Sequence, residues 1–102
     1  MATTTTANDY EVTYILRPSL EETDVDERAN AIAEGVKTRG GEVVGELEKH
    51  GKRRLAYEID DVREGYYVTM NFKSGPDEQK ELERQLRLNE SVLRHIIIRK
   101  GD

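Results

Sequence analysis

A short basic run, from Lys49 to Arg54, is the feature of this sequence with the clearest chemical potential. It reads Lys-His-Gly-Lys-Arg-Arg and continues directly into Leu55-Ala56-Tyr57. A guanidinium group pairs with phosphate in bidentate geometry, and each phosphate contact releases counterions. The glycine allows a close approach, and the Tyr57 ring is suited to stacking on an unpaired base. On these residues alone, an RNA contact and an edge strand protected by charge are equally good interpretations.

Other basic residues could extend such a contact. Because side chains alternate along a strand, Arg53 and Arg54 are expected on opposite faces. Arg84 and Arg87 fall on an expected helix, where basic residues are more often simply solvated. The residues predicted to contact RNA are Lys49, Lys52, Arg53, Arg54, Arg94, Arg99 and Lys100.

Catalytic and metal chemistry find little support in the sequence. His50 lies in the basic run and His95 in a strand-like segment, and neither has a Ser or Cys in a recognisable nucleophile arrangement. There is no His-x-x-x-His pair and no calcium-loop pattern, and the carboxylate pairs stand at helix starts or in a turn, where acids stabilise helix N-termini. We expect no enzyme activity, metal, cofactor or small-molecule substrate.

The net charge of −5 argues at first against a polyanionic partner, but the charge is unevenly distributed. Residues 1–48 carry 11 acidic and 4 basic side chains, whereas residues 49–102 carry 10 acidic and 12 basic ones. A basic surface on an acidic body is compatible with this polarity.

The length of 102 residues suits one domain, which we place at residues 10–100, between a flexible Thr-rich arm (1–9) and a short tail (101–102). Cysteine is absent, which is compatible with a reducing cytoplasm. No signal peptide is recognisable, and no segment approaches the roughly 18 apolar residues of a membrane span, so a soluble protein without a membrane partner is expected.

Hydrophobic periodicity predicts six secondary-structure elements. They are a strand over 10–16, a helix from an N-cap at Thr23 or Asp24 to Arg39, a long strand over 42–59 kinked at Gly51, a return strand over 66–73 after a polar turn over 60–65, a helix over 76–89 and a strand over 92–99. The strand side chains expected in the core are Tyr10, Val12, Tyr14, Leu16, Tyr66, Val68, Met70 and Phe72, and the second helix contributes Leu82 and Leu86.

The order βαββαβ predicts an α+β, ferredoxin-like sandwich, an antiparallel four-stranded sheet with two helices on one face. Each helix is expected to join strands that are parallel neighbours. The other face of the sheet then has no covering element, and Ile15, Tyr67 and part of Ile96-Ile97-Ile98 are expected there. An uncovered apolar face predicts a protein partner.

Several ordered motifs resemble the bacterial small-subunit ribosomal protein six family, and the similarity extends from Tyr10 to Lys100. Those motifs are Tyr10-Glu11-Val12, Leu16-Arg17-Pro18, Gly51-Lys52-Arg53-Arg54-Leu55-Ala56-Tyr57 followed by Ile59, Gly65-Tyr66-Tyr67, and Val92-Leu93-Arg94-His95. The resemblance implies a cytoplasmic, ribosome-bound structural protein that binds the central domain of small-subunit ribosomal RNA jointly with ribosomal protein eighteen. It assigns the basic motif to Lys52, Arg53 and Arg54, and predicts partner contacts at Leu55, Tyr57 and Tyr67.

The chain departs from the family pattern at three places. His50 stands where members often carry Trp, Glu58 where they often carry Pro, and Asn8-Asp9 precede Tyr10 where members often have basic residues. Two other ferredoxin-like classes compete: a homodimeric sensory module with a ligand or metal at its interface, and an acyl-phosphate hydrolase. The second requires a phosphate loop after the first strand, and Leu16-Arg17-Pro18-Ser19 supplies the Arg without glycines.

Overall fold

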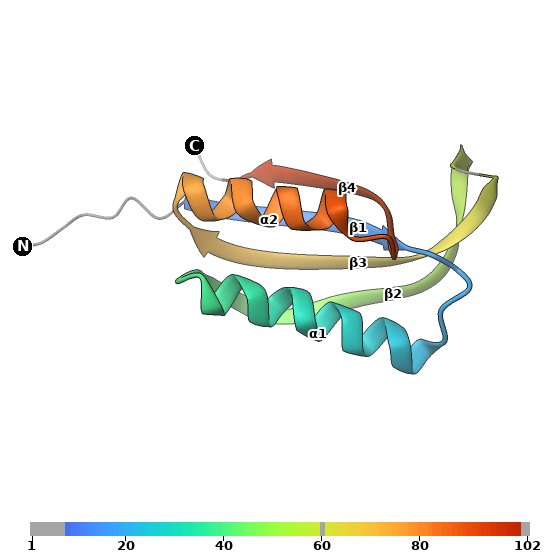
Figure 1. The fold of residues 1–102 in the computed structure, drawn as a ribbon, viewed down its shortest axis with the longest axis horizontal. Coiled ribbons are helices and arrows are strands. Elements are labelled where there is room, and N and C mark those ends of the chain that lie inside the picture. The colour runs from blue at the N-terminus through green and yellow to red at the C-terminus, as the bar shows by residue number, and fades with distance from the viewer. Residues whose placement is uncertain (1–7, 60, 101–102) are drawn as a thin grey trace, which may run out of the picture.

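The computed structural model describes residues 8–59 and 61–100, which form one four-stranded sheet with two helices on one face (Figure 1). The predicted arm (1–7) and tail (101–102) lie outside the described residues. The elements are β1 (Asn8–Leu16), α1 (Glu22–Thr38), β2 (Glu42–Ile59), β3 (Val62–Ser74), α2 (Pro76–Leu88) and β4 (Val92–Arg99). The predicted ferredoxin-like βαββαβ order is confirmed, although β1 begins two residues before the expected domain start.

The sheet has the strand order β2-β3-β1-β4, and every adjacent pair is antiparallel. Each helix therefore joins two parallel strands that are separated by one other strand. The prediction that these would be neighbours was wrong, because in each case the inserted strand pairs with both of them.

The core lies between the sheet and the helices, and the predicted alternation places it correctly. All eight strand side chains expected there are buried and pair with one another across β1 and β3, with Tyr10 stacked on Phe72 at 5.3 Å between ring centroids. The buried cluster comprises Tyr10, Val12, Tyr14, Leu16, Val25, Ala29, Ala33, Val36, Tyr66, Val68, Met70, Phe72, Leu82 and Leu86. Burial of these aliphatic and aromatic side chains is the main driving force for the fold.

Two predicted boundaries differ from the structure. The N-cap of α1 is Glu21, not Thr23 or Asp24, because the Asp24 carboxylate occupies the third helical position and accepts a hydrogen bond from the Glu21 backbone N–H at 3.3 Å. The polar turn expected over 60–65 is shorter, since Ile59 already pairs with Val62. Residues 62–65, which were expected in the turn, belong to β3.

Neither helix in the described part of the chain is long and apolar enough to cross a membrane.

Tyr14 is fully buried in the core, and its hydroxyl has no hydrogen-bond partner among the described residues. We expect Tyr14→Phe to raise the free energy of unfolding by about 1 kcal/mol, because an unsatisfied buried hydroxyl opposes folding. Burial also raises the pKa of the Tyr14 phenol above its ordinary value of 10.0. Above pH 10.0 the unfolded state therefore releases the phenol proton while the folded state keeps it, and the stability of the wild type declines as the pH rises.

Urea unfolding of both proteins at about pH 8 and about pH 11 measures these effects. The variant should be more stable at the lower pH, and the difference between the two pH values should be smaller for it than for the wild type. A less stable variant at about pH 8 would show that the hydroxyl is hydrogen-bonded in solution.

Candidate nucleic-acid and partner interface

The basic run lies on a β-hairpin that extends past the rest of the sheet. β1 pairs with β3 only as far as Leu16 opposite Tyr66, whereas β2 and β3 continue together through Arg53–Gly65 and Arg54–Glu64. The resulting two-stranded ribbon projects from one end of the molecule and bends out of line with the sheet (Figure 1). We call residues 52–59 and 61–65 the hairpin arm.

Extra residues in β2 explain the bend. Between Arg54 and Ile59, β2 advances five positions while β3 advances only two, and a further register shift occurs between Lys49 and Gly51. Gly51 has a φ of 82°, a conformation that glycine adopts without a steric penalty. The predicted kink at Gly51 is confirmed, and unequal strand lengths of this kind bend and twist a ribbon.

Strand register divides the basic run between the two faces of the sheet. Lys49 pairs with Val68 and Lys52 with Tyr66, both of which face the helices. The Lys49 ammonium lies 3.0 Å from the Asp26 carboxylate of α1, and the Lys52 ammonium lies 5.3 Å from the centroid of the Tyr66 ring. These two lysines therefore lie on the helix-covered side of β2.

The two arginines point to opposite faces, as alternation predicts. Arg54 is opposite Glu64, in the same alternation as Lys52 and Tyr66, whereas Arg53 is opposite Gly65 on the open face. The Arg53 guanidinium donates to the His50 carbonyl at 3.1 Å. Both arginines are exposed and neither forms an ion pair with another described residue, so both retain their full charge for an external anion.

Arg94 joins this end of the molecule through a contact that the sequence does not reveal. It pairs with Ile15 on the open face, and its guanidinium donates a hydrogen bond to the Tyr57 hydroxyl and lies 5.5 Å from the centre of the Tyr57 ring. β2 and β4 are the two edges of the sheet, so this contact requires the hairpin arm to fold across the open face.

That fold corrects one expectation, because part of the open face is covered by the chain itself. Leu55, Ile15, Tyr57 and Tyr67 line one hollow of about 240 Å³ beneath the hairpin arm. Leu55 is only 7% exposed and Ile15 only 8%. Leu55, one of the predicted partner contacts, is thus already buried. Tyr57 remains 59% exposed.

The remaining predicted RNA contacts lie elsewhere. Arg99 donates to the Asn8 side chain at 3.1 Å and Lys100 to the Asn71 side chain at 3.2 Å, at the end of the sheet where β1 begins. Along β4 the five residue-to-residue steps from Arg94 to Arg99 span about 17 Å. The structure therefore gathers Lys52, Arg53, Arg54 and Arg94 at one end and leaves Arg99 and Lys100 at the other.

The open face carries exposed apolar side chains that were not among the predicted partner contacts. Ile96 and Ile98 are 55% and 53% exposed, and their register positions, opposite Thr13 and Glu11, place them on this face. The alternation of Ile96-Ile97-Ile98 is the signal that identifies them, since Ile97 packs against the core. His50 also lies here, with its imidazole 3.2 Å from the Thr69 hydroxyl.

No group of three or more metal-binding side chains occurs among residues 8–59 and 61–100. His95 is half-buried in β4, and His50 is exposed in the basic run.

The chain matches the family model described as ribosomal protein S6 over residues 9–99. It belongs to the ribosomal protein S6 family. The small ribosomal subunit protein bS6 of Desulforamulus reducens is 45% identical over 94 residues, covering 92% of this chain and 98% of the relative. The bS6 protein of Natranaerobius thermophilus is 46% identical over 93 residues, covering 91% and 96%.

Structural comparison agrees with the family. The crystal structure of 30S ribosomal protein S6 from Thermotoga maritima superposes with a TM-score of 0.85 at 25% identity, covering 92% of this chain and 88% of that one. The C-terminal domain of the Mycobacterium tuberculosis MgtC protein shares only the fold, with a TM-score of 0.60 and 17% identity. Membership of the S6 family makes this chain a structural, non-enzymatic component of the small ribosomal subunit.

Proposed function

We propose that this chain binds the central domain of small-subunit ribosomal RNA jointly with ribosomal protein eighteen, and thereby supports subunit assembly and translation on cytoplasmic ribosomes. The observation that carries the proposal is the hairpin arm. It holds Lys52, Arg53 and Arg54 at a projecting end of the molecule, exposed and without ion pairs to other described residues.

The division of these side chains between two faces suits a folded RNA. Phosphates on two strands of a junction can approach the hairpin arm from both sides, with Arg53 and Arg94 on one side and Lys52 and Arg54 on the other. Contacts of this kind read the shape of the RNA more than its base sequence. Specificity then comes from the shape of the junction and from the joint surface with the protein partner.

The open face of the sheet is the proposed surface for ribosomal protein eighteen. It presents Ile96, Ile98 and Tyr57 to solvent beside the half-buried Tyr67. Arg94 lies on the same face, next to the proposed RNA end. A partner seated there can therefore contact RNA at the boundary that it shares with this chain.

The double substitution Arg53→Ala/Arg54→Ala tests the RNA contact. We expect about tenfold weaker binding to a central-domain RNA fragment in the presence of the partner, because charge-assisted hydrogen bonds to phosphate are lost. The salt dependence should also decrease, by about one unit of slope for each arginine that contacts a phosphate. Filter binding over a salt titration measures both quantities.

Arg84→Ala/Arg87→Ala is the matched control, because it removes the same charge from exposed positions on α2, away from the hairpin arm. It should leave both affinity and slope nearly unchanged. An equal loss of RNA affinity in the two double variants would mean that the affinity depends only on net charge. An unchanged affinity for Arg53→Ala/Arg54→Ala would refute the proposed contact.

A further inference from the structure

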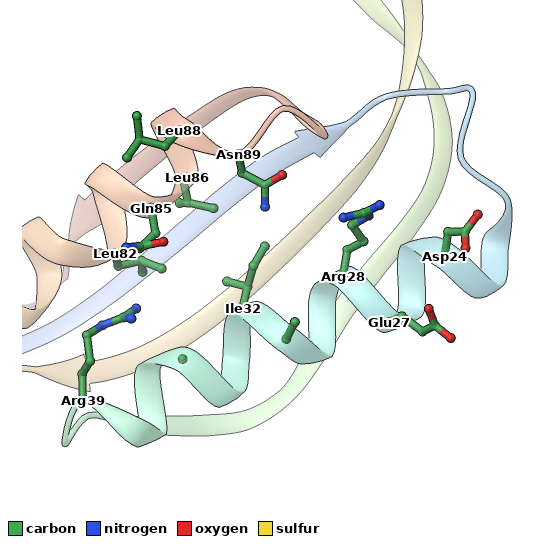
Figure 2. A pocket seen from close by; sticks show the side chains of 12 residues that line it. Asp24, Glu27, Arg28, Ile32, Arg39, Leu82, Gln85, Leu86, Leu88 and Asn89 are labelled. Atoms are coloured by element: carbon green, nitrogen blue, oxygen red, sulfur yellow. The ribbon is translucent and has the colours of Figure 1, made fainter.

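A groove of about 580 Å³ lies between α1 and α2, on the side of the molecule opposite the open face of the sheet (Figure 2). Four of its lining residues, Arg28, Ile32, Gly35 and Arg39, recur at spacings of four, three and four along α1. This spacing places them on one stripe of the helix, directed toward α2. The groove is therefore a continuous feature of the two-helix face.

The middle of the groove is apolar. Ile32 from α1 faces Leu82 and Leu86 from α2, and Leu88 stands at the rim with 62% of its surface exposed. Gly35 adds depth, because it contributes no side chain between the helices. Burying an exposed apolar strip of this kind against an apolar partner surface is energetically favourable.

One end of the groove is positively charged. The Arg39 guanidinium lies over Gly35, where an added Cβ would be 3.3 Å from Nη2, and its buried Nε has no hydrogen-bond partner. The neighbouring Glu81 carboxylate already accepts from Gln85 at 2.8 Å and from Arg84 at 3.4 Å. Arg84 and Glu81 offset each other, and the residues that line the groove beside Arg39 (Gly35, Leu82 and Gln85) are uncharged, which leaves a net charge of +1.

The other end has the opposite sign. Asp24 and Glu27 line it together with Arg28, and two carboxylates against one guanidinium leave a net charge of −1. Figure 2 shows these acids beyond Arg28, at the end of α1 far from Arg39. From Glu27 to Arg39 the groove follows twelve residues of chain, or about 18 Å.

We propose that this groove binds an amphipathic helix of about three turns from a protein partner, with an acidic first turn over Arg39 and a basic last turn over Asp24 and Glu27. The charge order then matches the usual distribution of charges along a helix, acids first and bases last. The bound helix runs antiparallel to α1 and covers Ile32 and Leu88 with its apolar side, above the buried Leu86.

Two features favour a protein over RNA at this site. The strip between the charged ends is apolar, and one end carries excess negative charge, which repels phosphate. The groove lies on the helix side of the sheet, so a partner here leaves the open face free. Helix binding in this groove and RNA binding at the hairpin arm therefore do not depend on each other.

Methyl-detected NMR of the full chain tests the proposal with two stapled peptides of about 14 residues. The first carries two Glu in its first turn, a leucine stripe, and two Lys in its last turn; the second exchanges the Glu and Lys positions. We expect the acid-first peptide to shift the methyl resonances of Ile32, Leu86 and Leu88 in a saturable manner. The exchanged peptide should bind about threefold more weakly, as expected for exposed ion pairs.

Two variants connect the binding to the groove. Arg39→Glu should remove the preference between the peptides, because both ends of the groove then carry a net charge of −1, whereas Lys37→Glu, outside the groove, should leave the preference in place. Gly35→Leu should abolish binding, since it fills the groove while displacing only the flexible end of Arg39. Thermal unfolding of each variant establishes that it is folded.

Several outcomes would overturn the proposal. They are the absence of saturable shifts at the groove methyls, equal affinity for the two peptides, or shifts confined to Ile96 and Ile98 on the open face. An oligouridylate that moves the groove methyls more strongly than either peptide would make the site one for RNA instead.

Discussion

Leu82→Ala should lower the free energy of unfolding by about 2–5 kcal/mol, the largest stability effect that we expect from one side chain of α2. Leu82 is 2% exposed and packs in the core between α2 and the sheet. Its truncation removes buried apolar surface and leaves a cavity that the surrounding strands cannot fill. Since domains of this size are stable by only about 5–15 kcal/mol, the variant should unfold at a much lower urea concentration.

Leu88→Ala is the matched control, because it makes the same chemical change on the same helix at a side chain that is 62% exposed. Its effect should be within about 0.5 kcal/mol of zero. Urea titrations of the two variants under identical conditions give the comparison. Similar midpoints for both would mean that α2 does not pack on the sheet in solution as it does here.

Gly65→Ala should destabilise the fold by about 3 kcal/mol, although it adds only one methyl group. A Cβ at this position would lie 2.3 Å from Ile15 Cγ2 and 3.0 Å from the Leu16 carbonyl oxygen. The first of these atoms belongs to a buried side chain and the second to the backbone of a paired strand, so neither can move without disrupting β1. The same displacement should loosen the hairpin arm above Ile15.

Gly35→Ala provides a control with the opposite expected sign. Gly35 lies inside α1, and an added Cβ would meet only the end of the flexible Arg39 side chain, at 3.3 Å. Alanine is favoured over glycine in helices, so stability should rise by about 0.5–1 kcal/mol. Chemical unfolding measures both variants, and hydrogen exchange across residues 52–59 reports on the hairpin arm. Unaltered stability in Gly65→Ala would show that β1 and β3 pack less closely in solution than they do in this structure.

Much of the fold could be predicted from local patterns. Alternation along 10–16 and 66–73 identified the buried faces of β1 and β3, because a strand that is half buried must place every second residue in the core. For α1, the helical spacing of apolar residues predicts one inward stripe, of which Val25, Ala29, Ala33 and Val36 are buried and Ile32 is partly buried. The start of α1 was placed two or three residues too late, because an Asp carboxylate can accept a backbone hydrogen bond either from the N-cap position or, as Asp24 does, from the third helical position.

For the candidate site, the sequence by itself determined the residue types, the concentration of basic charge in the second half of the chain, and the opposite orientation of Arg53 and Arg54. Those properties follow from composition and from the two-residue period of a strand. The tertiary structure alone decided which basic residues lie together. The extra residues of β2 relative to β3 depend on pairing register, and they fold the hairpin arm over the open face, where Tyr57 meets Arg94 from the far edge of the sheet. No local pattern records a contact between residues that distant in sequence, and so the same fold buries Leu55 and leaves Arg99 and Lys100 at the opposite end.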